Sequence, residues 1–183
     1  MGEAPVRVEL LGPAAALALL PALVEVYRAA FGAPPACEGE QEVARFRDES
    51  LPRHAGRADF ALAVARPPDP ARGVLGFAYA YTGRRGQYWS DMVAAALPAE
   101  VTAEWVGGHT EVVELAVHPD AQRRGVGRAL LETLLAASPN DRALLSTHRE
   151  DSPARRLYLA TGWVPLGDVG DGTVFGRVLR RRA

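Results

Sequence analysis

The stretch from Ala121 to Leu135, AQRRGVGRALLETLL, constrains the fold more than any other part of the chain. Gly125 and Gly127 stand one residue apart, directly before a leucine-rich run with helical spacing. A helix N-terminus leaves backbone N–H groups without partners and carries partial positive charge. Glycine removes the side chain that would hold a ligand away, and neighbouring arginines add further donors. The stretch therefore predicts a phosphate or pyrophosphate site at the start of a helix.

Two common phosphate-binding motifs do not match this stretch. The Walker motif requires a lysine after its last glycine, and the chain contains no lysine. The dinucleotide fingerprint requires a third glycine and an acidic residue about 20 positions further on, and neither is present in a clean form. Two glycines alone also fit a tight strand-to-helix turn, so the surrounding sequence has to decide between the two interpretations.

Composition predicts one folded domain over residues 1–183. The chain is 48% hydrophobic and 23% charged, which is enough to build a core. Its 21 basic and 22 acidic residues give a net charge of -1, so we expect no bulk attraction to nucleic acid or to an anionic membrane. The arginine-rich tail RVLRRRA, residues 177–183, is predicted to be a solvated end; binding of nucleic acid by this tail is the alternative. No metal site is predicted.

A cytoplasmic, soluble protein is expected from two further features. The longest uncharged run, Leu10 to Val24, is too short to span a bilayer and contains two prolines. Acidic residues precede it, which is unlike a signal peptide. The single cysteine, Cys37, excludes an internal disulfide, and its proline-rich surroundings predict an ordinary loop thiol.

The order of the predicted elements indicates an α/β fold with a mixed sheet. Strands are predicted at 5–11, 59–65, 73–81, 111–117, 142–148, 163–169 and 173–180, and helices at 14–31, 40–54, 126–137 and 152–162, with one short helix within 84–110. In the strand 73–81, large side chains share one face and small ones the other, so a helix can approach the small face closely. Strand–helix alternation in the second half predicts a parallel pair, and the antiparallel ends make the sheet mixed.

Two motifs resemble those of the GNAT superfamily, the acyl-CoA-dependent N-acyltransferases. The family's first pattern, glutamine or arginine, two residues, glycine, one residue, then glycine or alanine, is matched by Gln122, Arg123, Arg124, Gly125, Val126 and Gly127. The later motif is matched by Ala154, Leu157, Tyr158, Gly162 and Trp163. Asp151 stands where the family usually has asparagine, and Trp163 where it usually has phenylalanine. The departure at Asp151 puts one polar contact to the cofactor in doubt.

The resemblance implies acetyl-CoA as co-substrate and a mostly antiparallel sheet of about six or seven strands with a splayed parallel pair. By this resemblance, the pantetheine arm pairs with Leu115, Ala116 and Val117, and a backbone N–H near Leu115 or Ala116 polarises the acyl carbonyl. The pyrophosphate would lie on the loop and helix start formed by Gln122, Arg123, Arg124, Gly125, Val126, Gly127 and Arg128.

The implied activity is direct transfer of an acetyl group to an amine, on a small molecule or a peptide N-terminus. A domain that senses acyl-CoA without catalysis is the alternative. A homodimer through the C-terminal strands is a further expectation drawn from the resemblance.

Three residues are candidates for the proton transfers. Tyr158 matches the family position of an acid that protonates the leaving thiolate, and the alternative is packing on the sheet. Glu111 and Glu114 are candidate bases, three residues apart on one strand, so they are expected on opposite faces with only one directed at the acceptor. A solvated or paired carboxylate is the alternative for each. His109, His118 and His148 are weaker candidates.

Residues 84–110 carry three aromatic side chains that allow two interpretations. Tyr88, Trp89 and Trp105 either form an aromatic pocket that walls the acceptor site or anchor the segment to the rest of the molecule.

Overall fold

The computed structural model describes residues 6–34, 36–69 and 73–179. The chain divides into two compact units, the first formed by residues 1–80 and 113–137 and the second by residues 81–112 and 138–183. The boundary crosses the strands β3 (Gly76–Gly83) and β4 (His109–Val117), so each of these strands lies partly in one unit and partly in the other.

The strands form one mixed sheet of seven, in the order β1-β2-β3-β4-β5-β7-β6. The remaining strands are β1 (Arg7–Leu11), β2 (Ala61–Arg66), β5 (Arg142–His148), β6 (Val164–Val169) and β7 (Gly172–Val178). Strands β4 and β5 are parallel, with the register Thr110↔Ala143 and Glu111↔Leu144. The other neighbours are antiparallel, which confirms the predicted mixed and mostly antiparallel sheet.

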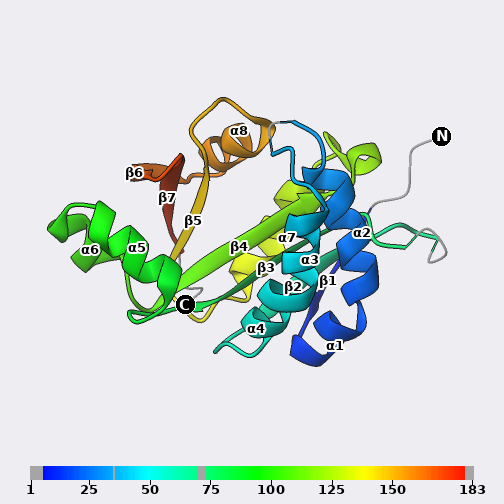
Figure 1. Ribbon diagram of the computed structural model, residues 1–183, viewed down its shortest axis with the longest axis horizontal. Coiled ribbons are helices and arrows are strands. Elements are labelled where there is room, and N and C mark those ends of the chain that lie inside the picture. The colour runs from blue at the N-terminus through cyan, green and yellow to red at the C-terminus, as the bar shows by residue number, and fades with distance from the viewer. Residues whose placement is uncertain (1–5, 35, 70–72, 180–183) are drawn as a thin grey trace. The chain divides into compact units, whose positions relative to one another are not determined.

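In the first unit, the two faces of β3 carry different layers of helix (Figure 1). Phe77 stacks on Phe46, and the Tyr79 hydroxyl lies 3.0 Å from Nδ1 of His54, so large side chains face the helices between β1 and β2. On the other face, a Cβ at Gly76 would meet the Leu130 side chain of α7 (Val126–Ala136) at 3.1 Å. The alternation of large and small residues in this strand therefore places α7 close to the sheet, as predicted.

The helices between β1 and β2 are more broken than their spacing predicts. A single helix over 14–31 was expected, but the structure has α1 (Pro13–Ala18) and α2 (Leu20–Phe31), which meet at Leu19. Pro21 explains the break because it has no N–H to bond the preceding turn.

The helix predicted at 40–54 forms with one wide turn in its middle. It comprises α3 (Glu40–Arg45), a π-helical turn at Phe46–Ser50 and α4 (Leu51–Ala55). In the wide turn, Leu51 N–H bonds the carbonyl of Phe46, five residues back. Pro52 follows at once and cannot donate a ladder bond of its own.

The second unit corrects the single short helix expected within 84–110. Two helices form there, α5 (Tyr88–Ala96) and α6 (Ala99–Trp105). Pro98 separates them, since it holds the preceding Leu97 in an extended conformation with ψ 156°.

Helices pack on both faces of β7 in this unit. A Cβ at Gly176 would meet the Trp105 ring of α6 at 2.6 Å. The preceding residue, Phe175, contacts Tyr158 of α8 (Pro153–Ala160), with ring centroids 6.3 Å apart. Successive residues of a strand point to opposite faces, so α6 and α8 cover different sides of β7.

Some sequence predictions lie outside the described residues. These are the end of the arginine-rich tail at 180–183, the first residue of the strand predicted at 5–11, and residues 70–72 of the turn before β3. Over the described ranges, no helix combines the length and apolar character needed to cross a membrane.

Candidate functional site

The loop between β4 and α7 belongs to the first unit and has an unusual backbone. Strand β4 ends at His118-Pro119, and a short 3-10 turn at Pro119–Ala121 follows. The Gln122 side-chain amide donates to the carbonyl of Val117 at 3.0 Å, which ties the loop to the end of the strand. Arg123 has φ 60° and Gly125 φ 78°, both in the left-handed region. Gly125 is favoured at this position because glycine adopts a positive φ without steric cost.

Helix α7 begins at Val126, directly after the loop. Gly125 is the N-cap, and the first backbone bond into the helix runs from Ala129 N–H to the Gly125 carbonyl at 3.0 Å. The N–H groups of Val126, Gly127 and Arg128 precede that bond, so they are available to an anion. Within α7, all of which the structure describes, no acidic residue stands in the first turn and no side chain caps it.

The predicted cofactor residues divide by exposure. Gln122, Arg123, Arg124, Gly125 and Arg128 are exposed, whereas the Val126 side chain is buried in the core and offers only its backbone N–H. Ala116 is also buried, while Leu115 and Val117 are half-buried. This arrangement suits the recognition of an anion by main-chain N–H groups, with exposed arginine side chains beside them.

Glu114 lies in the first unit, next to Leu115 on β4, in surroundings that favour its neutral form. Burial and the nearby Glu38 carboxylate raise the pKa of Glu114 to about 8. Glu38 accepts a hydrogen bond from the Tyr27 hydroxyl of α2. Burial, together with the charge of Glu114 and the hydrogen bond to Glu38, raises the pKa of Tyr27 well above its usual range. Three oxygen acids therefore interact here, and among the described residues no cation pairs with Glu38 or Glu114.

Glu111 lies in the second unit and is held by hydroxyl donors. Its side chain is buried, with 4% of the residue exposed. The Tyr81 hydroxyl donates to Oε1 at 2.6 Å, and the Ser90 hydroxyl lies 3.5 Å from Oε2. A carboxyl group fixed in this way stabilises the contact between β3, β4 and α5 inside the second unit.

His109 lies beside Glu111 and remains neutral near physiological pH. It is 1% exposed, and burial lowers its pKa to about 4. Nδ1 accepts from the Gly107 N–H at 3.1 Å, which places the ring proton on Nε2. Nε2 lies 3.9 Å from Glu111 Oε2 and has no hydrogen-bond partner among the described residues. His118 and His148, by contrast, lie near the surface.

A family model described as an acetyltransferase (GNAT) domain matches residues 74–165, which include β4, the loop and α7. The chain belongs to the GNAT acetyltransferase family. It is 36% identical over 121 residues to a GCN5-like protein acetyltransferase of Mycobacterium tuberculosis, and the match covers 58% of this chain and 59% of that protein. The chain thus aligns with little more than half the length of this relative.

Two solved structures show the same fold at low sequence identity. The PaiA N-acetyltransferase of Thermoplasma acidophilum, in complex with coenzyme A, has a TM-score of 0.67 at 16% identity, covering 95% of this chain and 99% of that one. The ribosomal-protein-S18-alanine N-acetyltransferase of Escherichia coli has a TM-score of 0.58 at 16% identity, covering 98% of this chain and 97% of that one.

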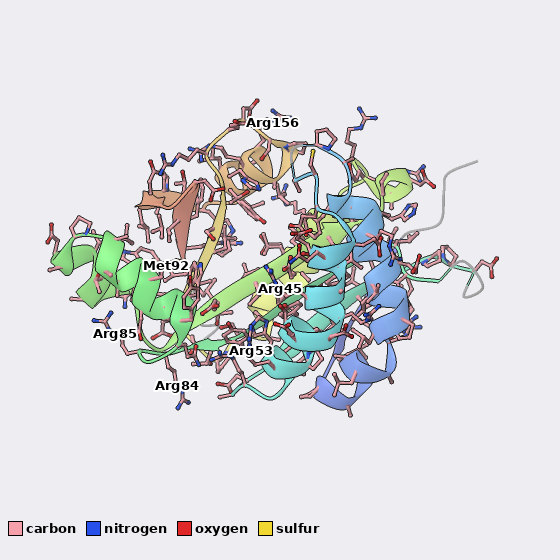
Figure 2. All side chains as sticks on the ribbon, in the orientation of Figure 1. Arg45, Arg53, Arg84, Arg85, Met92 and Arg156 are labelled. Carbon is pink, nitrogen blue, oxygen red and sulfur yellow. The ribbon has the colours of Figure 1, made fainter. Side chains whose placement is uncertain are left out.

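The second GNAT motif forms α8 and the start of β6 in the second unit. Ser152 caps α8 by accepting from the Arg155 N–H at 3.1 Å, and Gly162 follows the helix with φ 84°. Tyr158 is 6% exposed, and its ring packs edge-on against Trp163 at 5.9 Å. Asp151, at the position where GNAT proteins usually have asparagine, pairs instead with Arg156, which projects outward from α8 (Figure 2).

The aromatic residues of the 84–110 segment do not have a common role. Trp105 is buried in a cluster with Val93, Leu97, Leu144 and Val174, and Trp89 packs against the same cluster. Tyr88 is 82% exposed. The tryptophans therefore anchor the segment, whereas the Tyr88 side chain lies outside this cluster.

Tyr27 and Glu38 are the functional candidates that sequence reasoning missed. Nothing in the sequence around Glu38, in the loop GAPPACEGE, indicates a relation to a glutamate on a strand far along the chain. Over the described residues, no group of three or more His, Cys, Asp or Glu side chains is arranged to hold a metal ion.

Proposed function

We propose that this chain is an N-acyltransferase that moves an acetyl group from acetyl-CoA to a primary amine by direct transfer. The observation that carries the proposal is the start of α7, where Gly125 at φ 78° leaves three backbone N–H groups open to an anion. A helix N-terminus without acidic residues favours a pyrophosphate, and exposed arginines on both sides add charge-assisted donors.

Acetyl-CoA supplies the thioester whose acyl carbon the amine attacks. In the proposal, Gln122, Arg123, Arg124, Gly125, Val126, Gly127 and Arg128 hold the pyrophosphate, mainly through main-chain N–H groups. The backbone of Leu115, Ala116 and Val117 holds the pantetheine arm by strand-like pairing. A backbone N–H at Leu115 or Ala116 donates to the acyl oxygen and stabilises the charge that develops there.

Glu114 is the better of the two candidate bases. A primary amine has a pKa of roughly 10 and must lose a proton before it attacks. The best general base has a pKa near the working pH, and the pKa of Glu114 is about 8. Glu111 already accepts from Tyr81 and Ser90, so we assign it to the packing of the second unit. Tyr158 is the proposed acid for the leaving thiolate, since a phenol carries its proton at neutral pH.

The names of related proteins support acetyl transfer to an amino group. The Mycobacterium tuberculosis relative is a protein acetyltransferase, and the Escherichia coli structural neighbour acts on an alanine of a ribosomal protein. We propose an amine on a small molecule or a peptide N-terminus as the acceptor. The cytoplasm is the proposed location and a homodimer the proposed assembly.

Calorimetry with coenzyme A tests the phosphate site directly. Gly125→Ala forces a side chain into a left-handed conformation that costs about 1–2 kcal/mol, so the loop should change shape and the Kd should rise about tenfold. Gly170→Ala is the matched control, because Gly170 has φ 59° and equally open surroundings but lies in the β6–β7 turn. Equal Kd values for both variants would exclude this loop as the binding site.

The alternative function is a domain that senses acyl-CoA without catalysis. Thiol release from acetyl-CoA across a panel of amines separates the two. A large loss of turnover in Tyr158→Phe with unchanged binding of coenzyme A supports the enzyme. Binding without turnover on any amine supports the sensor.

A further inference from the structure

The wide turn at Phe46–Ser50 changes which side chains share a face of the helix that runs from α3 to α4. Seven residues make about two turns of a regular α-helix, and a π turn holds one residue more. Arg45 and Arg53 stand eight residues apart on either side of this turn, so they lie two turns apart on nearly the same face. Without the wide turn, the same spacing would separate them by about 80° around the helix axis. Figure 2 shows both side chains on the side of the helix that points away from α2.

The guanidinium groups of Arg45 and Arg53 are exposed and unpaired. Neither makes a hydrogen bond or an ion pair within the part of the chain that the structure describes. Glu49 stands four residues from each of them, a spacing that favours ion pairs in a regular helix, and it pairs with neither. Arg47 of the same turn is different, because it pairs with Asp48 at 2.6 Å. Two unpaired guanidinium groups on one face are able to bind an external anion.

The buried side of this helix fixes its position on the sheet of the first unit. Phe46, which follows the first of the two arginines, stacks on Phe77 of β3 with ring centroids 5.7 Å apart. His54, which follows the second, has Nδ1 at 3.0 Å from the hydroxyl of Tyr79 on the same strand. Strand β3 is the neighbour of β4, which carries Ala116 and the proposed site of the acyl carbonyl. The arginine pair therefore belongs to a fixed helix that packs one strand away from that site.

We propose that Arg45 and Arg53 bind the carboxylate groups of an acidic amine acceptor. The inference rests on the proposed function, since the acceptor is the amine that receives the acetyl group. It narrows the acceptor from any primary amine to one that also carries carboxylates at a distance from its amino group. Two turns of helix span about 11 Å, so the pair can hold two carboxylates at once.

The surroundings of the pair favour carboxylate over phosphate. The exposed Glu49 carboxylate lies in the wide turn between the two arginines and repels an arriving anion. A phosphate group carries about −1.5 to −2 charges at pH 7, whereas a carboxylate carries one. The repulsion therefore weighs more heavily against a phosphorylated acceptor than against an acidic one.

The first test measures binding by NMR and needs no turnover. The Nε–Hε signals of the arginines are followed while the peptide amide Ala-Glu-Glu-Glu, or its counterpart Ala-Gln-Gln-Gln, is added to the full chain. The glutamate peptide should shift the signals of Arg45 and Arg53, and the glutamine peptide should shift neither. Arg47 is the internal control, because its guanidinium group is already paired. Signals of Arg45 and Arg53 that the glutamate peptide leaves unmoved would overturn the inference.

The second test compares the KM values of the two peptides with acetyl-CoA as co-substrate. We expect a KM about tenfold lower for the glutamate peptide, since charge-assisted hydrogen bonds hold it. Arg45→Gln and Arg53→Gln should each remove part of this preference, and the double variant should remove it. Arg47→Gln takes the same charge from the same helix and should keep it. An ionic strength of about 1 M, where the screening length is about 3 Å, should weaken the preference.

The outcomes separate this inference from the proposed function. Turnover with equal KM values for the two peptides keeps the function and overturns the inference, as does a preference that persists in the double variant. Shifted signals of Arg45 and Arg53 without turnover on any amine support the anion site and defeat the function. A lower KM for free glutamate than for the glutamate peptide identifies a small acidic amine as the acceptor, and the reverse identifies an acidic N-terminus. Tighter binding of a phosphoserine peptide would overturn the assignment to carboxylates.

Discussion

Glu114 in the first unit and Glu111 in the second are carried by the same strand, three residues apart, but their surroundings differ chemically. Glu111 receives hydroxyl donors from Tyr81 and Ser90, whereas burial, together with the charge of Glu38, raises the pKa of Glu114. Hydrogen-bond donors satisfy a carboxyl group and fix it in place. A nearby like charge instead raises the pKa of a carboxyl group, so that it can exchange a proton near neutral pH. The comparison teaches that two acids on one strand can differ in their partners, so that one is fixed by hydroxyl donors and the other favours its neutral form.

The sharpest way to break this comparison is to replace the two acids in turn. Glu114→Gln should lower kcat/KM by about 100- to 1,000-fold, since it removes the general base while keeping the size of the side chain. Steady-state kinetics with one amine and acetyl-CoA measure the effect, and the Kd for coenzyme A should stay unchanged. If Glu111→Gln gives the larger loss per folded molecule, the assignment of the base is reversed.

Tyr81→Phe tests the structural side of the comparison. It removes the 2.6 Å bond to Glu111 and should lower the free energy of unfolding by about 1–2 kcal/mol. Urea unfolding measures this loss. The Glu114 carboxyl pKa serves as the control and should not move, because Tyr81 is not among the groups that raise it.

The contributions of Glu114 in the first unit and His109 in the second to the free energy of unfolding should change with pH in opposite directions. The pKa of Glu114 is raised from 4.5 to about 8, so its stabilising contribution is complete below pH 4.5 and is lost as pH rises through 8. The pKa of His109 is lowered from 6.5 to about 4, so its contribution is complete above pH 6.5 and is lost as pH falls through 4.

Urea unfolding at a series of pH values separates the two slopes. Glu114→Gln should flatten the alkaline slope, and His109→Asn should reduce the acid slope. Part of the acid slope should remain in that variant, because burial also lowers the pKa of His54 to about 4. An unchanged alkaline slope in Glu114→Gln would contradict the raised pKa.

Ser90→Ala has the smallest expected effect. The Ser90 hydroxyl lies 3.5 Å from Glu111 Oε2, at the limit of a hydrogen bond, so its loss should cost about 0.5 kcal/mol of unfolding free energy. A cost above that of Tyr81→Phe would show that Ser90, and not Tyr81, is the main donor to Glu111.

Local sequence chemistry predicted much of the fold, including the helix that begins between the two glycines of the loop. The cap at Ser152 and the stop at Gly162, which the sequence indicates by residue type, each depend on residues within one helical turn, and the structure shows both. The alternation of β3 predicted which face α7 approaches. The predictions failed where a proline broke a helical pattern, at Pro21 and between α5 and α6 at Pro98.

The sequence by itself determined the family, the mixed sheet and the helix start that suits a pyrophosphate, because each depends on residue types at short spacing. Only the tertiary structure distinguished Glu114 from Glu111. Glu38, whose charge acts on Glu114, lies in the loop after α2, far away in the sequence, and Coulomb interaction depends on distance in space. A spacing of three residues along β4 carries no information about which carboxyl group meets a hydroxyl and which meets another carboxylate.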